Sequence, residues 1–201
     1  DIRGFTTLSE QLPPEKVVAL LNEYLTPMTR VVIEAGGTVD KYMGDAIMAF
    51  FGAPVPQADH AERAARAALG MREALAALNA RRAVRGEPPI AFGIGINTGL
   101  LSVGNMGSEM IFDYTVIGDA ANLGSRLEGL NKAYGTDILV SEFTLAALPP
   151  AFVRRELDRV RVKGRKEPVA VFELIGLEGD QRGWARGAGE AGAEFARAEA
   201  A

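Results

Sequence analysis

The chain has 201 residues, of which 48% are hydrophobic and 24% charged, values typical of a globular domain with a substantial core. The net charge of −4 argues against nucleic acid as a partner, and the absence of cysteine excludes disulfides and thiolate metal sites. No apolar run approaches the ~18 residues needed to cross a bilayer, and no signal peptide is visible. We therefore expect no membrane contact from this segment itself. We expect a cytoplasmic location, alone or as the cytoplasmic domain of a longer membrane-anchored or sensor-linked protein.

The first third of the chain predicts helices on either side of a hairpin. A short helix is expected over residues 6–12, capped by Thr6 or Thr7. Pro13-Pro14 opens a long helix with apolar residues at helical spacing, which Gly36-Gly37 ends. Strand-type residues then flank Gly44-Asp45, a pair typical of a two-residue hairpin loop. An Ala-rich stretch predicts a second long helix over about residues 59–82.

The remainder mixes strands and helices without strict alternation. The expected elements are strands over 90–98, 100–103 and 111–117, a helix over 119–134 closed by Gly135, a strand over 138–140, a short helix over 142–148, and a strand pair over 152–162 and 169–174. This pattern predicts an α+β domain over residues 1–177, followed by a linker or flexible tail over 178–201. Gly93-Ile94-Gly95 lacks the full dinucleotide-binding fingerprint and lies within a predicted strand, so we reject that interpretation.

His60 is the only histidine, so Ser/His/Asp catalysis would depend on it. It lies in an Ala/Arg-rich helical stretch, where a partly exposed structural histidine is the expectation. The acidic residues are more informative. Asp45 at a hairpin tip would be held by rigid backbone, although alone it is also typical of an ordinary polar turn. Asp1 precedes a Gly turn and a helix start, and two such carboxylates could hold hard divalent cations such as Mg²⁺.

Both acidic stretches resemble the class III nucleotide cyclase catalytic domain. The first is Asp1-Ile2-Arg3-Gly4-Phe5-Thr6, and the second is the hairpin that contains Gly44-Asp45-Ala46. The resemblance implies a ferredoxin-like βαββαβ core with a mixed, mostly antiparallel sheet. In the family a strand leads into the first Asp, so we expect the sequence to be a piece of a longer protein with that strand missing.

The resemblance implies that Asp1, Ile2 and Asp45 hold two divalent cations, Mg²⁺ or Mn²⁺, on a nucleotide triphosphate. One ion would activate the ribose 3′-hydroxyl, and the other would neutralise charge on the phosphates and the leaving group. No general-base side chain is then required.

Lys41, four residues before Asp45, would alone be a solvated strand residue. In family members that use ATP, a Lys in this frame contacts adenine, and guanylate cyclases carry Glu there. Lys only donates hydrogen bonds, which suits the adenine N1 acceptor. The resemblance places its partner at Thr115, whose hydroxyl can accept from the adenine amino group.

Asn122 and Arg126 are spaced i, i+4, which alone is typical of a polar helix face. By resemblance they are the transition-state pair: Arg126 stabilises charge on the α-phosphate, and Asn122 orients the ribose. Lys163 matches a family Lys that contacts the terminal phosphates, whereas the adjacent Arg165 and Lys166 are interpreted as surface charge.

In the family, metal ligands come from one subunit and the remaining site residues come from the other. This chain carries both sets, so a homodimer would have two equivalent shared sites. The leading hypothesis is an adenylate cyclase that converts ATP to cyclic AMP and pyrophosphate in signal transduction. The alternatives are a guanylate cyclase, a non-catalytic cyclase-like module that dimerises or binds nucleotide, and a binding domain with chance motifs.

Overall fold

The structure is a computed structural model that describes residues 1–161 and 167–179. Its elements are α1 (Phe5–Glu10), α2 (Pro14–Glu34), β1 (Thr38–Met43), β2 (Ala46–Phe50), α3 (His60–Val84), β3 (Ile94–Ile96), β4 (Ser102–Gly107), β5 (Phe112–Ile117), α4 (Asp119–Tyr134), β6 (Ile138–Ser141), α5 (Glu142–Leu145), β7 (Phe152–Val160) and β8 (Val169–Leu177). The expected α+β class is confirmed. No helix in these two described ranges is both long and apolar enough to cross a membrane.

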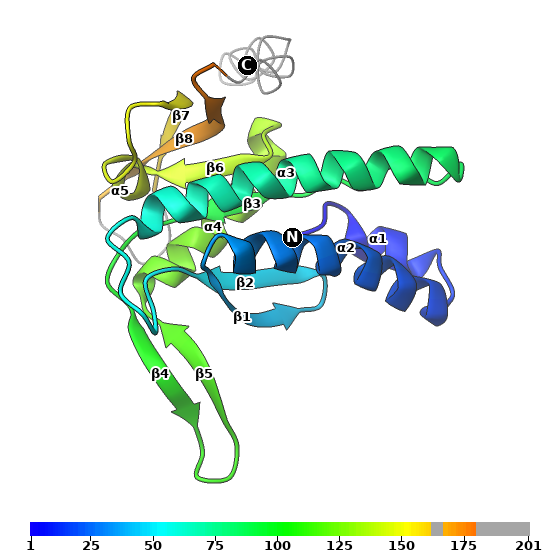
Figure 1. Cartoon of the computed structure of the whole chain (residues 1–201), viewed down its shortest axis with the longest axis horizontal. Coiled ribbons are helices and arrows are strands. Elements are labelled where there is room, and N and C mark those ends of the chain that lie inside the picture. Colours follow the sequence, from blue (N-terminus) through cyan, green and yellow to red (C-terminus); the bar gives the residue numbers. More distant parts are fainter. Residues whose placement is uncertain (162–166, 180–201) are drawn as a thin grey trace.

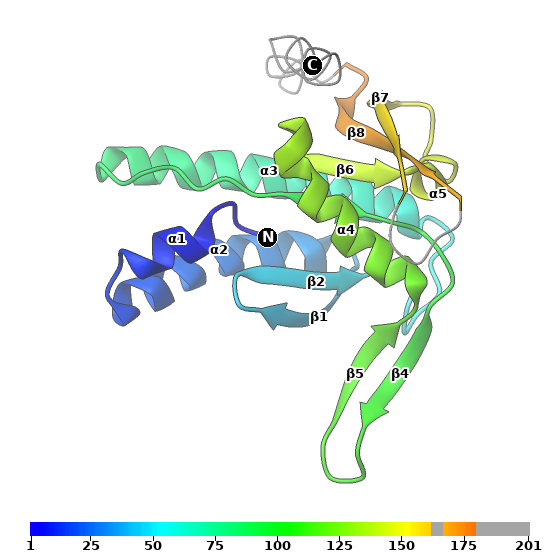
Figure 2. The same cartoon turned by 180° about the vertical axis from the view of Figure 1, so that it is seen from behind.

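A four-stranded sheet with the order β3-β6-β8-β7 forms the centre of the domain. Only the β3–β6 pair in this sheet is parallel. Helix α3 covers one face, as Figure 1 shows, and α4 covers the opposite face in Figure 2. Every residue of β6 is buried, because successive side chains point to opposite faces and both faces are covered.

Two apolar clusters fill the two sides of this sheet. Ile138 and Val140 of β6 pack with α2 and α3, whereas Leu139 packs with Leu123 and Leu127 of α4. Helix α2 joins the first cluster through side chains spaced four residues apart, namely Leu20, Tyr24, Met28 and Val32. The predicted helical spacing of this segment is therefore confirmed.

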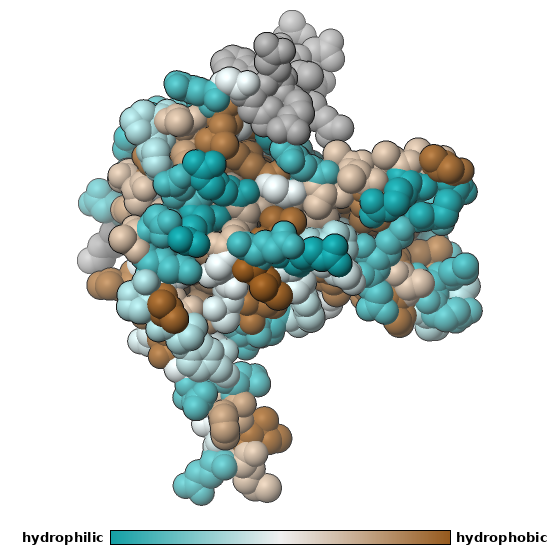
Figure 3. Space-filling view, viewed as in Figure 1, coloured by the Kyte–Doolittle hydropathy of each residue, from teal (hydrophilic) through white to brown (hydrophobic). Residues whose placement is uncertain are grey.

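Two antiparallel hairpins lie outside the central sheet. The β1–β2 hairpin packs beside α2, and Gly44 at its turn has a φ of 67°, which is why Gly is needed there. The β4–β5 hairpin projects from the body as an arm (Figures 1 and 2). Hydrophobic side chains lie near the end of this arm (Figure 3), and Met110, Ile111 and Phe112 are 91%, 77% and 61% exposed.

The expected continuous strand over residues 90–98 is wrong, because its backbone groups have several different partners. Asn79 of α3 exchanges two 2.8 Å hydrogen bonds with the backbone of Ile90. Residues 91–93 instead pair with residues 1–3, through bonds such as that from the Gly93 N–H to the Asp1 carbonyl. Only Ile94–Ile96 forms a strand with β6.

Other boundaries also differ from the sequence prediction. The N-cap of α1 is Gly4 in the left-handed conformation, with no side-chain cap, so the predicted Thr6 or Thr7 cap is wrong. Strand β4 runs over Ser102–Gly107 rather than 100–103, because its pairing with β5 lies outside the core and leaves no apolar pattern. Helix α5 ends at Leu145 rather than 148. By contrast, α4 and its left-handed cap at Gly135 match the prediction.

Candidate nucleotide and metal site

Asp45 lies beside the first residues of the chain. Its Oδ2 accepts a 3.0 Å hydrogen bond from the backbone N–H of Ile2. Ile2 is itself fixed by its buried side chain, 2% exposed, and by pairing with Phe92. The fold therefore brings together the Asp45 hairpin and the Asp1-Ile2 segment, the two stretches that were predicted to hold metal ions.

The local charge suits a divalent cation. Burial raises the pKa of the Tyr24 hydroxyl above its ordinary value, and the negative charges of Asp45 and Glu128 raise it further. Glu128 of α4, which the sequence analysis did not single out, thus lies in the same electrostatic environment as Asp45. Its side chain occupies the space beside Gly93, where a Cβ would lie 2.6 Å from its Oε1.

The donor set fits a cation that also binds substrate. The described residues contain no group of three or more His, Cys, Asp or Glu side chains arranged to hold a metal ion. Two carboxylates with a neighbouring main-chain carbonyl are hard oxygen donors, and Mg²⁺ commonly completes such a shell with substrate phosphates and water. Asp1, Ile2 and Asp45 are the residues that would hold the ions.

Lys41 and Thr115 meet at a third residue, Asp40. Thr115 Oγ1 donates a 2.6 Å hydrogen bond to Asp40 Oδ2, and Lys41 Nζ lies 3.4 Å from Asp40 Oδ1. The Asp40 side chain is fully buried, whereas 38% of the Lys41 side chain is exposed. The structure therefore brings the two predicted base-binding residues, which lie on β1 and β5, to one carboxylate that sequence reasoning missed.

Helix α4 carries Asn122 and Arg126 and is fixed to β3 and to Asn97, the residue that follows β3. Asn97 Nδ2 donates to the Ala120 carbonyl at 2.9 Å, and Asn131 Nδ2 donates to the Ile94 carbonyl at 3.0 Å. Between these bonds, a Cβ on Gly95 would lie only 2.1 Å from the Gly124 carbonyl oxygen. The position of the helix is thus closely defined before any ligand binds.

Arg126 has a donor available for a ligand. Its Nη1 is buried and has no hydrogen-bond partner among residues 1–161 and 167–179. A buried guanidinium N–H without an acceptor is costly, so such groups are common where a ligand supplies the acceptor. Asn122, one turn earlier on α4, is exposed. Lys163, with Arg165 and Lys166, lies outside the described residues.

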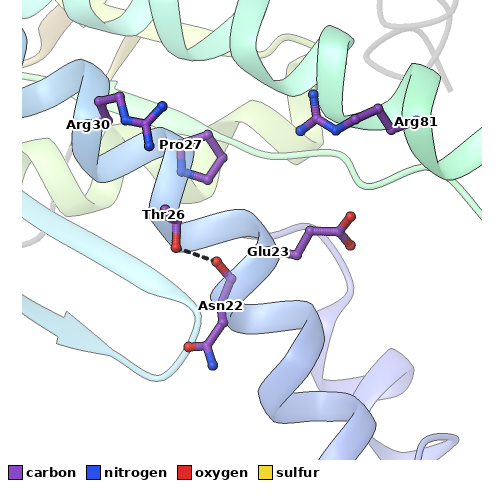
Figure 4. Close-up of a pocket in the computed structure, with 6 residues that line it drawn as sticks. All are labelled: Asn22, Glu23, Thr26, Pro27, Arg30 and Arg81. Atoms are coloured by element: carbon purple, nitrogen blue, oxygen red, sulfur yellow. Dashed lines mark hydrogen bonds between the residues drawn. The ribbon is translucent and has the colours of Figure 1, made fainter.

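The remaining candidates lie elsewhere. His60 is half-buried at the first residue of α3, beside Gly52, as expected of a structural histidine. A pocket of about 360 Å³ lies between α2 and α3 (Figure 4). Its lining residues are Asn22, Glu23, Thr26, Pro27, Arg30 and Arg81, so it contains none of the described site residues.

A family model for the adenylate and guanylate cyclase catalytic domain matches residues 1–176. The chain belongs to this family. Adenylate cyclase 1 of Rhizobium meliloti is 40% identical over 177 residues, which are 88% of this chain and 27% of that protein. The adenylate cyclase of Anabaena cylindrica is 41% identical over 181 residues, which are 87% of this chain and 35% of that protein. The chain thus spans about a third or less of these curated relatives.

Solved cyclase structures confirm the nucleotide cyclase fold. The adenylyl cyclase CyaB from P. aeruginosa is 38% identical with a TM-score of 0.82, and the match covers 90% of this chain and 92% of that one. The guanylyl cyclase Cya2 is 40% identical with a TM-score of 0.79, and the match covers 90% and 91%. Because both nucleotide specificities occur at this similarity, the choice of base depends on individual residues of this cyclase domain.

Proposed function

We propose that this cyclase domain converts ATP to 3′,5′-cyclic AMP and pyrophosphate. The observation that carries the proposal is the Ile2–Asp45 hydrogen bond, which joins the two acidic motifs of the family into one oxygen-rich site. In the reaction the ribose 3′-oxygen bonds to the α-phosphorus, and the bond from that phosphorus to the pyrophosphate oxygen breaks. The 3′-hydroxyl proton passes to solvent, and pyrophosphate leaves.

The chain's own residues have separate roles in this proposal. Two divalent cations, Mg²⁺ or Mn²⁺, would promote ionisation of the 3′-hydroxyl and offset phosphate charge when bound. Arg126 donates through its unpartnered Nη1 to oxygens of the α-phosphate, where negative charge develops. Asn122 orients the ribose, and Lys163 contacts the terminal phosphates.

The adenine assignment depends on Lys41 and Thr115. Lys41 donates to adenine N1, and Thr115 accepts from the adenine amino group. Guanine has the opposite groups at these positions, because its N1–H donates and its O6 accepts. The proximity of both residues to Asp40 supports a common base site.

Each site in the proposal is shared by two copies of the chain. One copy supplies the metal ligands Asp1, Ile2 and Asp45. The other copy supplies the residues that contact the nucleotide, namely Lys41, Thr115, Asn122, Arg126 and Lys163. The exposed apolar residues on the β4–β5 arm supply a surface that a second copy could cover.

A cyclic-nucleotide assay at several protein concentrations tests the proposal, with ATP and GTP in parallel and with Mg²⁺ or Mn²⁺. We expect cyclic AMP from ATP, a specific activity that rises with protein concentration as dimers form, and complete loss on chelation. A preference for GTP would favour the guanylate cyclase alternative. Absence of both products would favour a non-catalytic module.

A further inference from the structure

Asp40 occupies an irregular position in the β1–β2 hairpin. Val39 pairs with Ala49 and Lys41 pairs with Met48, so Asp40 is the extra residue of a β-bulge on β1. A bulge redirects side chains that strict alternation would send to opposite faces. Here Asp40 contacts Thr115 of β5, and Lys41 Nζ approaches the same carboxylate.

Both oxygens of the buried Asp40 carboxylate face donors. Oδ2 accepts from Thr115 Oγ1 at 2.6 Å and from the Val116 backbone N–H at 3.4 Å. Oδ1 faces the Lys41 ammonium at 3.4 Å. Since a backbone N–H can only donate, Oδ2 acts as an acceptor, whereas Oδ1 forms an ion pair with Lys41 and has no hydrogen bond among the described residues.

This arrangement fixes the direction of the Thr115 hydroxyl. A threonine hydroxyl has one hydrogen to donate and two lone pairs that can accept. Because Asp40 takes the single hydrogen, Thr115 Oγ1 can offer only lone pairs to any further partner. Lys41, held beside the same carboxylate, can offer only hydrogens.

We infer that Asp40 is a positioning residue that sets the base specificity of the site, by fixing Thr115 as an acceptor beside the Lys41 donor so that adenine is selected over 6-oxopurines. The inference rests on the proposed function. A 6-oxopurine would place its 6-oxo group, an acceptor, against the acceptor at Thr115. It would also place its N1–H, a donor, against the donor at Lys41. A site that hydrogen-bonds a substrate group strongly disfavours an analogue in which the donor and the acceptor are exchanged.

The experiment compares kcat/KM for ATP, GTP and inosine triphosphate, which has the 6-oxo group and N1–H without the 2-amino group. In Asp40→Ala, Thr115 is free to rotate and donate. In Asp40→Ser, the new hydroxyl can bond the Val116 N–H while also donating to Thr115. We expect each variant to lower the ATP to inosine triphosphate ratio roughly tenfold, as for one misdirected hydrogen bond.

A double-mutant cycle separates this role from a purely structural one. Thr115→Val lacks the hydroxyl, so adding Asp40→Ser to it should leave the ratio unchanged, even if the thermal midpoint falls further. Asp113→Ala removes an exposed carboxylate two residues before Thr115 on β5 and should keep the wild-type ratio.

The outcomes distinguish the two proposals. A wild-type protein that prefers ATP, together with folded Asp40 variants that keep its ratio within twofold, would overturn the role of Asp40 and leave the proposed function intact. A wild-type protein that forms no cyclic nucleotide from any of the three substrates would overturn both.

Discussion

The backbone N–H of Ile2 donates to Asp45 Oδ2 at 3.0 Å, and this bond joins segments 43 residues apart. It orients the Asp45 carboxylate by using one lone pair of one oxygen. The remaining lone pairs stay available to other donors or to a cation. The metal half of the proposed site is therefore arranged within a single chain.

Asp45→Asn should lower turnover by about 100-fold or more, because the neutral amide cannot offset cation charge, and metal-assisted charge stabilisation is worth several kcal/mol. The amide oxygen can still accept from Ile2, so the thermal midpoint should change little. Cyclase assays and circular dichroism on the same samples test this, with Asp59→Asn, a surface residue paired with Arg63, as the control. Near-normal activity with either Mg²⁺ or Mn²⁺ would contradict the metal assignment.

Mixing two inactive variants tests the shared site. Asp45→Ala and Arg126→Ala should each be nearly inactive, since every homodimer lacks one group in both sites. After subunit exchange about half the dimers are mixed, and one site in each of these combines an intact Asp45 with an intact Arg126. The mixture should recover roughly a quarter of wild-type cyclic AMP formation. Confirmed exchange, by pull-down of differently tagged chains, without recovered activity would exclude a site shared in this way.

Gly95→Ala should disturb α4. The added Cβ would lie 2.1 Å from the Gly124 carbonyl oxygen and 2.3 Å from the Glu128 nitrogen, both backbone atoms of α4. We expect a loss of about 1–3 kcal/mol in unfolding free energy, with reduced kcat because Arg126 moves with the helix. Gly129→Ala, on the same helix in open space, should instead stabilise by about 0.5–1 kcal/mol. Urea unfolding measures both, and an unchanged Gly95→Ala midpoint would refute the close contact.

Arg82→Ala should destabilise the domain by about 3 kcal/mol, because it removes a nearly buried partner of Glu23 and of the Pro88 carbonyl. The neighbouring Arg81 is exposed, so Arg81→Ala should stay within about 0.5 kcal/mol of wild type. Thermal and urea unfolding compare the two. Equal effects of the two substitutions would show that the Arg82 ion pairs contribute nothing to stability.

Features determined by local chemistry could be predicted from the sequence. The Gly44-Asp45 turn and the left-handed cap at Gly135 depend on glycine's conformational freedom, and both are confirmed. The helical spacing of α2 likewise predicted its buried face. The structure gives Gly95 a different role from phosphate binding. The absence of a side chain at Gly95 allows the backbone of α4 to pack closely against it.

Features that depend on non-local partners could not be predicted. Residues 90–98 do not form one continuous strand, because Asn79 hydrogen-bonds the backbone of Ile90 and residues 1–3 pair with residues 91–93. Asp40 lies at a bulge of β1 and contacts Thr115 of β5, which is 75 residues away in the sequence, and neither feature follows from the residues of β1 alone. Glu128 is placed beside Gly93 through packing of α4 against β3. The roles assigned to Asn122, Arg126 and Lys163 remain predictions.

The β1–β2 hairpin carries Lys41 on its first strand and Asp45 at its tip. In a dimer with shared sites, these two residues of one chain serve opposite sites, one reading a base and the other holding metal. A displacement of the β1–β2 hairpin would therefore change the geometry of both sites at once. Nucleotide binding at one site should then alter affinity at its twin, and the coupling would be seen as a Hill coefficient different from one.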